Sequence, residues 1–224
     1  MCWSWQVSSA AAVCHLLLLS ILKVERLGRW EYDVFLILFA SMEIVLALLH
    51  VFLHNHLLNT ILTVLAYILI YLQPVAFTLF SRNKTLIRLS IITLIAALLS
   101  LSAGFLSTPT YSLPNTNYGL CTQTTLDENG HHVWSFALKT IQYHPTHYVY
   151  LLLIGAAIYE MKGEILYTLG LGWLLTLIFT LLWIGLTPSL PAVWCLTSVF
   201  VCIPIMIRTY LIKKEANKWK GNYY

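Results

Sequence analysis

Residues 34–54 read VFLILFASMEIVLALLHVFLH, a run of 21 residues in which Glu43, His50 and His54 are the titratable side chains. An α-helix rises 1.5 Å per residue, so about 20 apolar residues are enough to cross the hydrocarbon core of a bilayer. The stretch is therefore predicted to form a transmembrane helix with one carboxyl group near its centre.

The whole chain shares this apolar character. Of its 224 residues, 59% are apolar and only 10% are charged, whereas a soluble domain carries about 25% charged residues. Such a chain cannot cover a core with a solvated surface, which argues against a soluble enzyme, a disordered protein and a nucleic-acid binder. The composition predicts an integral membrane protein that is surrounded by lipids.

Seven stretches of the chain reach or approach the length of a membrane span when it is divided at its charges and prolines. They are residues 3–22, 34–54, 57–80, 86–106, 145–161, 165–185 and 191–212. Their combined length leaves no room for a second domain. We therefore expect an all-α membrane protein, a single seven-transmembrane-helix bundle over residues 1–224.

The connections are short except for residues 107–144, between the fourth and fifth predicted helices. This loop contains Asn129-Gly130, a pair typical of tight hairpin turns, and Trp134, Phe136 and Leu138 follow it in the alternation of a half-buried strand. The loop is predicted to form a small β-hairpin that caps the bundle.

The basic residues predict how the bundle is oriented. With seven crossings, 12 of the 13 lysines and arginines fall on the side of the C-terminus, and Lys139 falls on the other side. Because basic loops stay in the cytoplasm, the N-terminus and the hairpin are expected to be extracytoplasmic and the C-terminus cytoplasmic. This asymmetry also accounts for the net charge of +4 without a nucleic-acid partner. Self-association of the chain stays open.

Glu43 is the acidic residue that falls near the centre of a predicted span. An ionised carboxylate at that depth costs at least about 3 kcal/mol. His50 and His54 follow at seven and eleven positions, so a continuous helix would place all three within about 20° of one line. The stripe predicts a site that binds an ion or exchanges a proton. The alternative is a protonated Glu43 that hydrogen-bonds a neighbouring helix, with interfacial histidines.

The third predicted span adds Tyr67, Tyr71 and Gln73 to this candidate site. Gln73 precedes Pro74, whose missing N–H frees a backbone carbonyl one turn earlier. Polar side chains beside a broken hydrogen-bond ladder often line a cavity in membrane proteins. We expect a cavity that opens outward and is lined by the second, third and seventh helices.

Histidine and cysteine gather at the outer side of the predicted bundle. A metal ion could be held by His50, His54, His131 and His132, although no HExxH or CxxC motif fixes a ligand set. No other cofactor is expected. Of Cys2, Cys121 and Cys195, two are predicted to form a disulfide, with Cys2 and Cys195 favoured. The alternative is a free, reactive Cys2 beside His131.

Several short motifs suggest a relationship. They are Met1-Cys2-Trp3-Ser4, Met42-Glu43, Gln73-Pro74, Gly130-His131 with Trp134, and Trp194-Cys195. With them the chain resembles an uncharacterised seven-helix membrane protein family, with an N-terminal Met-Cys-Trp, found in large DNA viruses and microbial eukaryotes. The resemblance implies no known activity, but it adds weight to Cys2, Glu43, His131 and Cys195.

Two other seven-helix classes do not fit. The last predicted span has no lysine before Lys213, so it offers no Schiff-base partner for retinal, and it has no histidine of the kind that zinc-dependent lipid amidases place there. The favoured function is a channel or transporter for a proton, cation or small polar solute. The alternatives are a membrane-embedded enzyme that acts on a lipid through an outer cysteine or a histidine-bound metal, and a structural or partner-binding protein.

Overall fold

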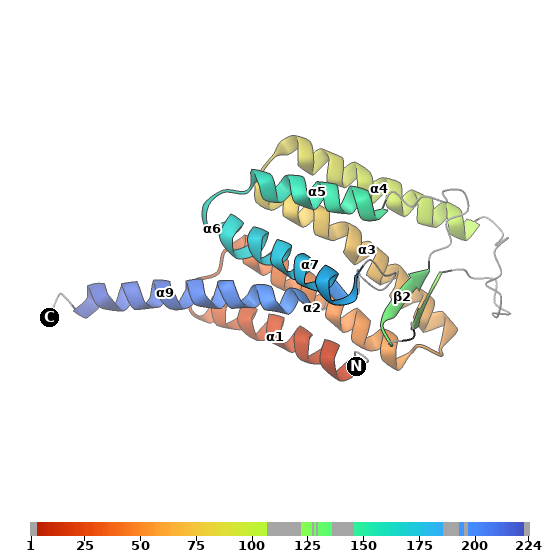
Figure 1. The fold of residues 1–224 in the computed structure, drawn as a ribbon, viewed down its shortest axis with the longest axis horizontal. Coiled ribbons are helices and arrows are strands. Elements are labelled where there is room, and N and C mark those ends of the chain that lie inside the picture. The colour runs from red at the N-terminus through yellow and green to blue at the C-terminus, as the bar shows by residue number, and fades with distance from the viewer. Residues whose placement is uncertain are drawn as a thin grey trace.

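The computed structural model describes residues 4–106, 122–126, 128, 130–135, 146–185, 193–194 and 197–221. It is mostly helical with one small antiparallel sheet, as predicted (Figure 1). The elements are α1 (Trp5–Val24), α2 (Trp30–Val51), α3 (His56–Ser81), α4 (Lys84–Leu106), β1 (Gln123–Leu126), β2 (His132–Ser135), α5 (Thr146–Glu160), α6 (Gly163–Ile165), the π-helical η1 (Leu166–Gly170), α7 (Leu171–Ile184), the 3-10 helical η2 (Ser198–Val201) and α9 (Cys202–Gly221).

Among the residues that the structure describes, five helical segments are long and apolar enough to cross a membrane. They are α1, α2, α3, the part of α4 up to Ala103, and the continuous segment Gly163–Trp183. A further apolar helix, Val149–Glu160, is shorter than this length. The length and apolar character of these helices therefore support the prediction that several helices cross a membrane.

The helix ends differ from the predicted spans in two informative places. α2 begins at Trp30, before residue 34, because Glu31 and Asp33 in its first turn favour the positive end of the helix dipole. It ends at Val51, because Asn55 starts the next helix by accepting a hydrogen bond from the Leu58 backbone N–H at 3.1 Å.

The last predicted span, residues 191–212, also differs from the observed helix. α9 starts at Cys202 after a short 3-10 turn and continues to Gly221, beyond the predicted end. Pro204 lies in its first turn, where a missing backbone N–H has no helical partner to lose.

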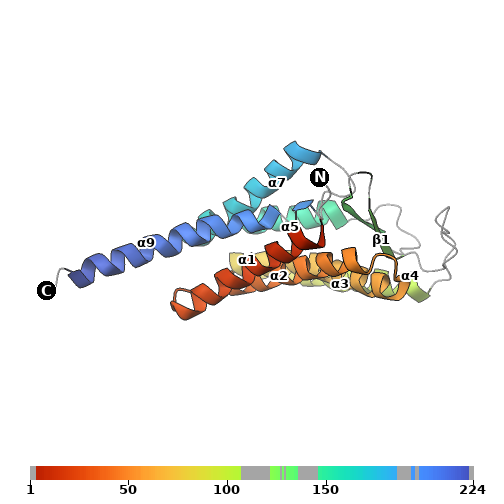
Figure 2. The same cartoon turned by 90° about the horizontal axis from the view of Figure 1, so that it is seen from below.

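The chain connections divide between the two ends of the bundle. The α1–α2, α3–α4 and α5–α6 connections lie at the end from which α9 projects, and the sheet and the α2–α3 connection lie at the other (Figures 1 and 2). We call the first the basic end, because Arg29, Arg82 and Lys162 lie in its connections. The second is the hairpin end.

The largest core cluster joins α2 to the helices around it. Trp173 of α7 is fully buried, and its ring lies 4.7 Å from Phe39 and 6.2 Å from Phe35, both on α2. Trp194 stacks on the other side of Trp173, with ring centroids 4.6 Å apart. Aromatic packing therefore fixes the depth of α2 against α7.

A π-helical turn precedes α7. It runs from Leu166 to Gly170, after Gly163, whose φ of +59° places it in the left-handed region. π turns hold one extra residue per turn and occur often at functional sites. This turn carries Thr168, which is buried and faces α2.

Candidate functional site

Glu43 occupies the centre of α2 and has no exposed surface. Ser8 of α1 lies close to its carboxyl group, but neither carboxyl oxygen meets hydrogen-bond geometry with any described residue. Buried polar groups in proteins are almost always hydrogen-bonded, so an unpartnered carboxyl group calls for an explanation. Glu43 is therefore a buried carboxyl group at the centre of α2 whose role as a site residue stays a prediction.

His50 lies two turns further along α2, where it meets the hairpin. Its ring centroid is 4.1 Å from that of His132 on β2. Burial lowers the pKa of His132 to about 3, and the neighbouring His50 and His131 lower it further. Two imidazoles this close disfavour a charge on either, so this pair is neutral at ordinary pH.

Hydrogen bonds from α3 hold the hairpin in place. The Asn59 side chain donates to the Thr124 carbonyl at 2.9 Å and accepts from the Thr124 N–H at 2.8 Å, as a neighbouring strand would. The hydroxyls of Thr63 and Thr124 lie 2.7 Å apart. Since Asn59, Thr63 and Thr124 are all buried, the hairpin is a fixed part of the bundle.

His15 of α1 lies on the other side of Glu43 along α2. It is fully buried, and its ring lies 6.5 Å from Phe35 and 6.4 Å from Phe39, which places it between the levels of Glu43 and the start of α2. Its Nδ1 is 2.8 Å from the Ala11 carbonyl and its Nε2 is 3.4 Å from the Ser198 hydroxyl. The carbonyl can only accept, so Nδ1 carries the proton and Nε2 is the basic nitrogen.

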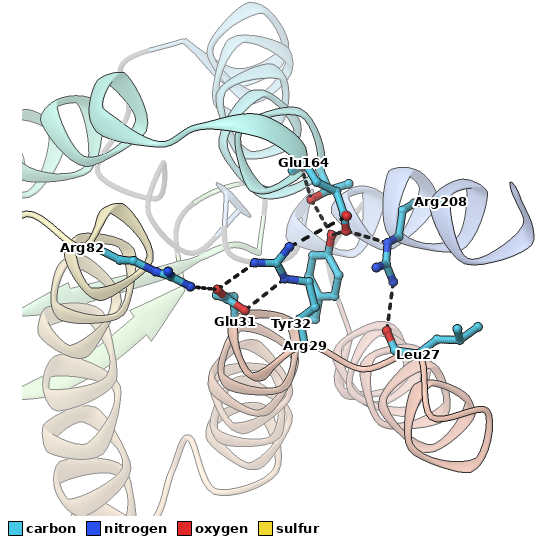
Figure 3. A network of polar contacts seen from close by, with 8 residues as sticks. Leu27, Arg29, Glu31, Tyr32, Arg82, Glu164 and Arg208 are labelled. Carbon is cyan, nitrogen blue, oxygen red and sulfur yellow. Dashed lines mark hydrogen bonds and ion pairs between the residues drawn. The ribbon is translucent and has the colours of Figure 1, made fainter. Parts of the chain in front are cut away.

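Tyr32 continues the site toward the basic end (Figure 3). Its hydroxyl donates to the Glu164 carboxylate at 2.5 Å and lies 3.0 Å from the Thr168 hydroxyl. Glu164 also forms an ion pair with Arg208 at 2.5 Å, and Arg208 donates to the Leu27 carbonyl at 2.9 Å. These contacts join α2, the start of α6 and α9 at one point.

A second acidic group, Glu31, lies beside this network (Figure 3). It is 1% exposed and accepts hydrogen bonds from Arg29 at 3.2 and 3.3 Å and from Arg82 at 3.3 Å. The hydrogen bond to Glu31 raises the pKa of Arg29. A cavity of about 430 Å³ is lined by these side chains together with Lys162 and Glu160.

The predicted polar stripe keeps two of its members and loses the third. His54 lies beyond the end of α2 and is exposed, so it does not continue the line of Glu43 and His50. Tyr32 takes its place at the opposite end, because eleven positions at about 100° per residue bring it within about 20° of Glu43. The stripe therefore runs from Glu43 toward the basic end as well as toward the hairpin end.

Tyr67, Tyr71 and Gln73, which we expected beside Glu43, contact other helices. The two tyrosines pack with Ala97 and Leu101 of α4. The Tyr67 hydroxyl donates to the Ala97 carbonyl at 3.3 Å, and Gln73 accepts a hydrogen bond from Tyr150 of α5. These three side chains therefore lie on the face of α3 that meets α4 and α5, whereas Glu43 lies near α1.

The residues of the metal and cysteine predictions separate in the same way. Within the described ranges, no three His, Cys, Asp or Glu side chains gather as a metal site would require. His50, His131 and His132 belong to the hairpin end, while His54 is exposed. Cys2, Cys121 and Cys195 lie outside the described residues, so their pairing and reactivity stay predictions. Cys14 and Cys202 are free thiols.

Sequence reasoning missed the half of the site that lies toward the basic end. The predicted span began at residue 34, which left Glu31 and Tyr32 in a loop, and Glu164 fell just before the span 165–185. The spacing of eleven between Tyr32 and Glu43 was the available signal, since it matches the spacing between Glu43 and His54. His15 had no signal beyond its place within a span.

Comparison with known proteins adds one relative. The chain is 29% identical over 233 residues to an uncharacterised protein of Acanthamoeba polyphaga mimivirus, R287, and the match covers 94% of this chain and 96% of R287. This similarity supports a viral family of unknown function, in line with the resemblance drawn from the short motifs. No family model and no solved structure matches the chain.

Proposed function

We propose that the protein is a membrane channel or transporter for a proton, cation or small polar solute, with Glu43 as its central binding group. The observation that carries the proposal is the Glu43 carboxyl group, fully buried in an apolar bundle and without a hydrogen-bond partner among the described residues. A carboxyl group that only held helices together would be hydrogen-bonded across a helix interface. A carboxyl group without such a bond can instead bind the proton, cation or solute that crosses the bundle.

The arrangement of the ends supports a membrane-crossing orientation for this function. We infer seven crossings, in which α5 and the helical segment ending in α9 join the five longer helices. The basic end then faces the cytoplasm, in line with the gathering of its connections at one end of the bundle (Figure 1). The hairpin covers the extracytoplasmic ends of α2 and α3.

Flux through reconstituted vesicles tests the proposal. Liposomes that contain the purified protein are loaded with dyes that report protons, Na⁺ and K⁺. Uptake is measured for the wild type and for Glu43→Gln. The exchange keeps the size of the side chain and removes its charge, so we expect flux to fall at least about tenfold, the effect of about 1.4 kcal/mol on the barrier. Ser41→Ala, two positions away on the same helix and bonded to the Ile37 carbonyl instead of Glu43, is the matched control.

Two results decide between transport and packing. Flux lost in Glu43→Gln, with Ser41→Ala active and both variants monodisperse and helical, supports the proposal. A Glu43→Gln variant that carries every tested species at the wild-type rate overturns it, and Glu43 is then a packing residue.

A further inference from the structure

We propose that the transported species is a proton, and that it moves along the face of α2 through His132 and His50, Glu43, His15, and the Tyr32–Glu164 pair. This inference rests on the proposed function and names the substrate of the same site. It is carried by a series of titratable side chains that spans the bundle from the hairpin to the basic end. His132, Glu43, His15 and Tyr32 are buried, and His50 and Glu164 are partly exposed.

The surroundings of Glu43 favour a proton over a metal cation. A dehydrated cation such as Ca²⁺ or Mg²⁺ takes six or more oxygen ligands. Across the part of the chain that the structure describes, Ser8 is the polar side chain recorded beside the Glu43 carboxyl group. A proton needs one acceptor at a time, which the carboxyl group alone supplies.

The basic end also discriminates against cations. Any ion that leaves the bundle along α2 meets Glu164, but Arg208 lies 2.5 Å from this carboxylate and the Arg29 guanidinium lies 3.9 Å from it. Arg208 also lies over the ring of Tyr32, at 5.5 Å. Positive charge at a constriction repels cations, whereas a proton can pass through the Tyr32 hydroxyl to Glu164 without a cation passing the arginines.

The intervals along α2 suit a chain of water molecules. Glu43 and His50 are seven positions apart, about 10 Å along the axis, which takes two or three water molecules at about 2.8 Å per hydrogen bond. Glu43 and Tyr32 are eleven positions apart, about 16 Å. His15 divides this longer interval, because it contacts Phe35 and Phe39.

The polar groups that face each step are few and mostly neutral. Ser8 faces Glu43, Ser198 faces His15, and His132 faces His50. Tyr32 is the exception, since it faces Glu164, Thr168 and Arg208. The charged groups therefore gather at the inner exit, where the Glu164 side chain is 33% exposed and can exchange a proton with water.

The experiment compares matched pairs of variants in vesicles that contain a pH-sensitive dye. Tyr32→Phe removes a hydroxyl from the path, and Tyr71→Phe removes one from a buried tyrosine that packs against α4. His15→Gln removes a titratable group from the path, and His54→Gln removes one from an exposed position. We expect proton flux to fall at least about tenfold in each path variant and less than about twofold in each control.

A solvent isotope measurement supplies a readout that does not depend on any substitution. Wild-type flux should slow when H₂O is replaced by D₂O on both sides of the membrane, because each transfer moves a hydrogen nucleus. The stability of every variant is followed by thermal unfolding. If His15→Gln fails to fold, the pair of tyrosine variants decides the question alone.

The outcomes separate this inference from the function on which it rests. Glu43-dependent Na⁺ or K⁺ flux, with Tyr32→Phe and His15→Gln as active as their controls, overturns the proton path and leaves a cation transporter. A Glu43→Gln variant with wild-type flux of all species overturns the proposed function itself. Proton flux that depends on Glu43, His15 and Tyr32 supports both.

Discussion

The two ends of the bundle are closed by different interactions. At the hairpin end, neutral groups meet: Asn59 pairs with the backbone of Thr124, and the His50 and His132 rings lie 4.1 Å apart. At the basic end, charged groups meet, with Glu31 between two arginines and Glu164 against Arg208. Neutral hydrogen bonds depend on direction, and ion pairs depend on charge and salt.

Because of this difference, salt and acid should weaken the contacts at different ends of the bundle. The hairpin end has no ion pair among its described residues, so salt has little to act on there. The basic end has no buried, partnerless histidine in the region that the structure describes, so mild acid has little to act on there. The four predictions below test this separation.

The largest effect should follow the removal of the Asn59 side chain. Asn59→Ala leaves the Thr124 N–H and C=O buried without partners and removes the bond to the Leu53 carbonyl, so docking of the hairpin should weaken by about 3 kcal/mol. Hydrogen exchange at residues 123–126 measures this loss. Asn55→Ala, at an exposed helix cap on the same end, should leave that exchange nearly unchanged, and equal protection in both variants would contradict the prediction.

Acid should have the next largest effect, again at the hairpin end. The pKa of His132 is about 3 when docked and about 6.5 when exposed, so only the undocked hairpin takes up a proton between these values. Docking is therefore unaffected above about pH 6.5 and weakens below it, by about 2 kcal/mol at pH 5. Hydrogen exchange as a function of pH, corrected for the intrinsic rate, measures this. His132→Asn should remove the dependence and His54→Gln should keep it.

A charge change at the basic end should have a smaller effect. Glu31→Gln removes the ion pairs to Arg29 and Arg82, but both arginines reach water. The free energy of unfolding should therefore fall by only about 1 to 2 kcal/mol. Thermal unfolding in nanodiscs at low and high salt measures the loss, which should shrink at high salt. Glu160→Gln, in the same cavity and without an ion pair among the described residues, is the control.

The smallest effect should come from the ion pair between Lys213 and Glu25. The two groups are 2.7 Å apart, but both side chains are about two-fifths exposed. Lys213→Ala should change the free energy of unfolding by less than about 0.5 kcal/mol. The same unfolding measurement decides this, and a loss as large as that of Glu31→Gln would mean that exposure is a poor guide to the ion pairs of this end.

Apolar length and turn chemistry were sufficient to predict a mostly helical chain with several long apolar helices and a small hairpin. The pattern of 21 residues around Glu43 identified α2, and Asn129-Gly130 identified the turn between β1 and β2. The ends of the helices were harder to predict. Charged residues suggest a loop, although acidic residues in a first helical turn interact favourably with the helix dipole. For this reason Tyr32 and Glu164 were left outside the predicted helices.

Contacts between helices could not be read from one helix at a time. Tyr67 and Tyr71 carry the same polar signal whether they face α2 or α4, and only packing decides that they face α4. The same holds for His15, whose role depends on Ser198, 183 positions away. Periodicity assigns residues to a face but does not say which neighbour that face meets.

The π-helical turn at Leu166–Gly170 makes the length of the chain itself a determinant of the contacts among Tyr32, Glu164 and Arg208. Deleting one residue there would restore an ordinary α-helical turn and rotate everything on its N-terminal side by about 100° relative to α7. Trp173 could stay in the core, but Glu164 would swing away from Tyr32 and Arg208. In evolutionary terms, one codon lost within this turn would separate Glu164 from Tyr32 and Arg208 while all three side chains were retained.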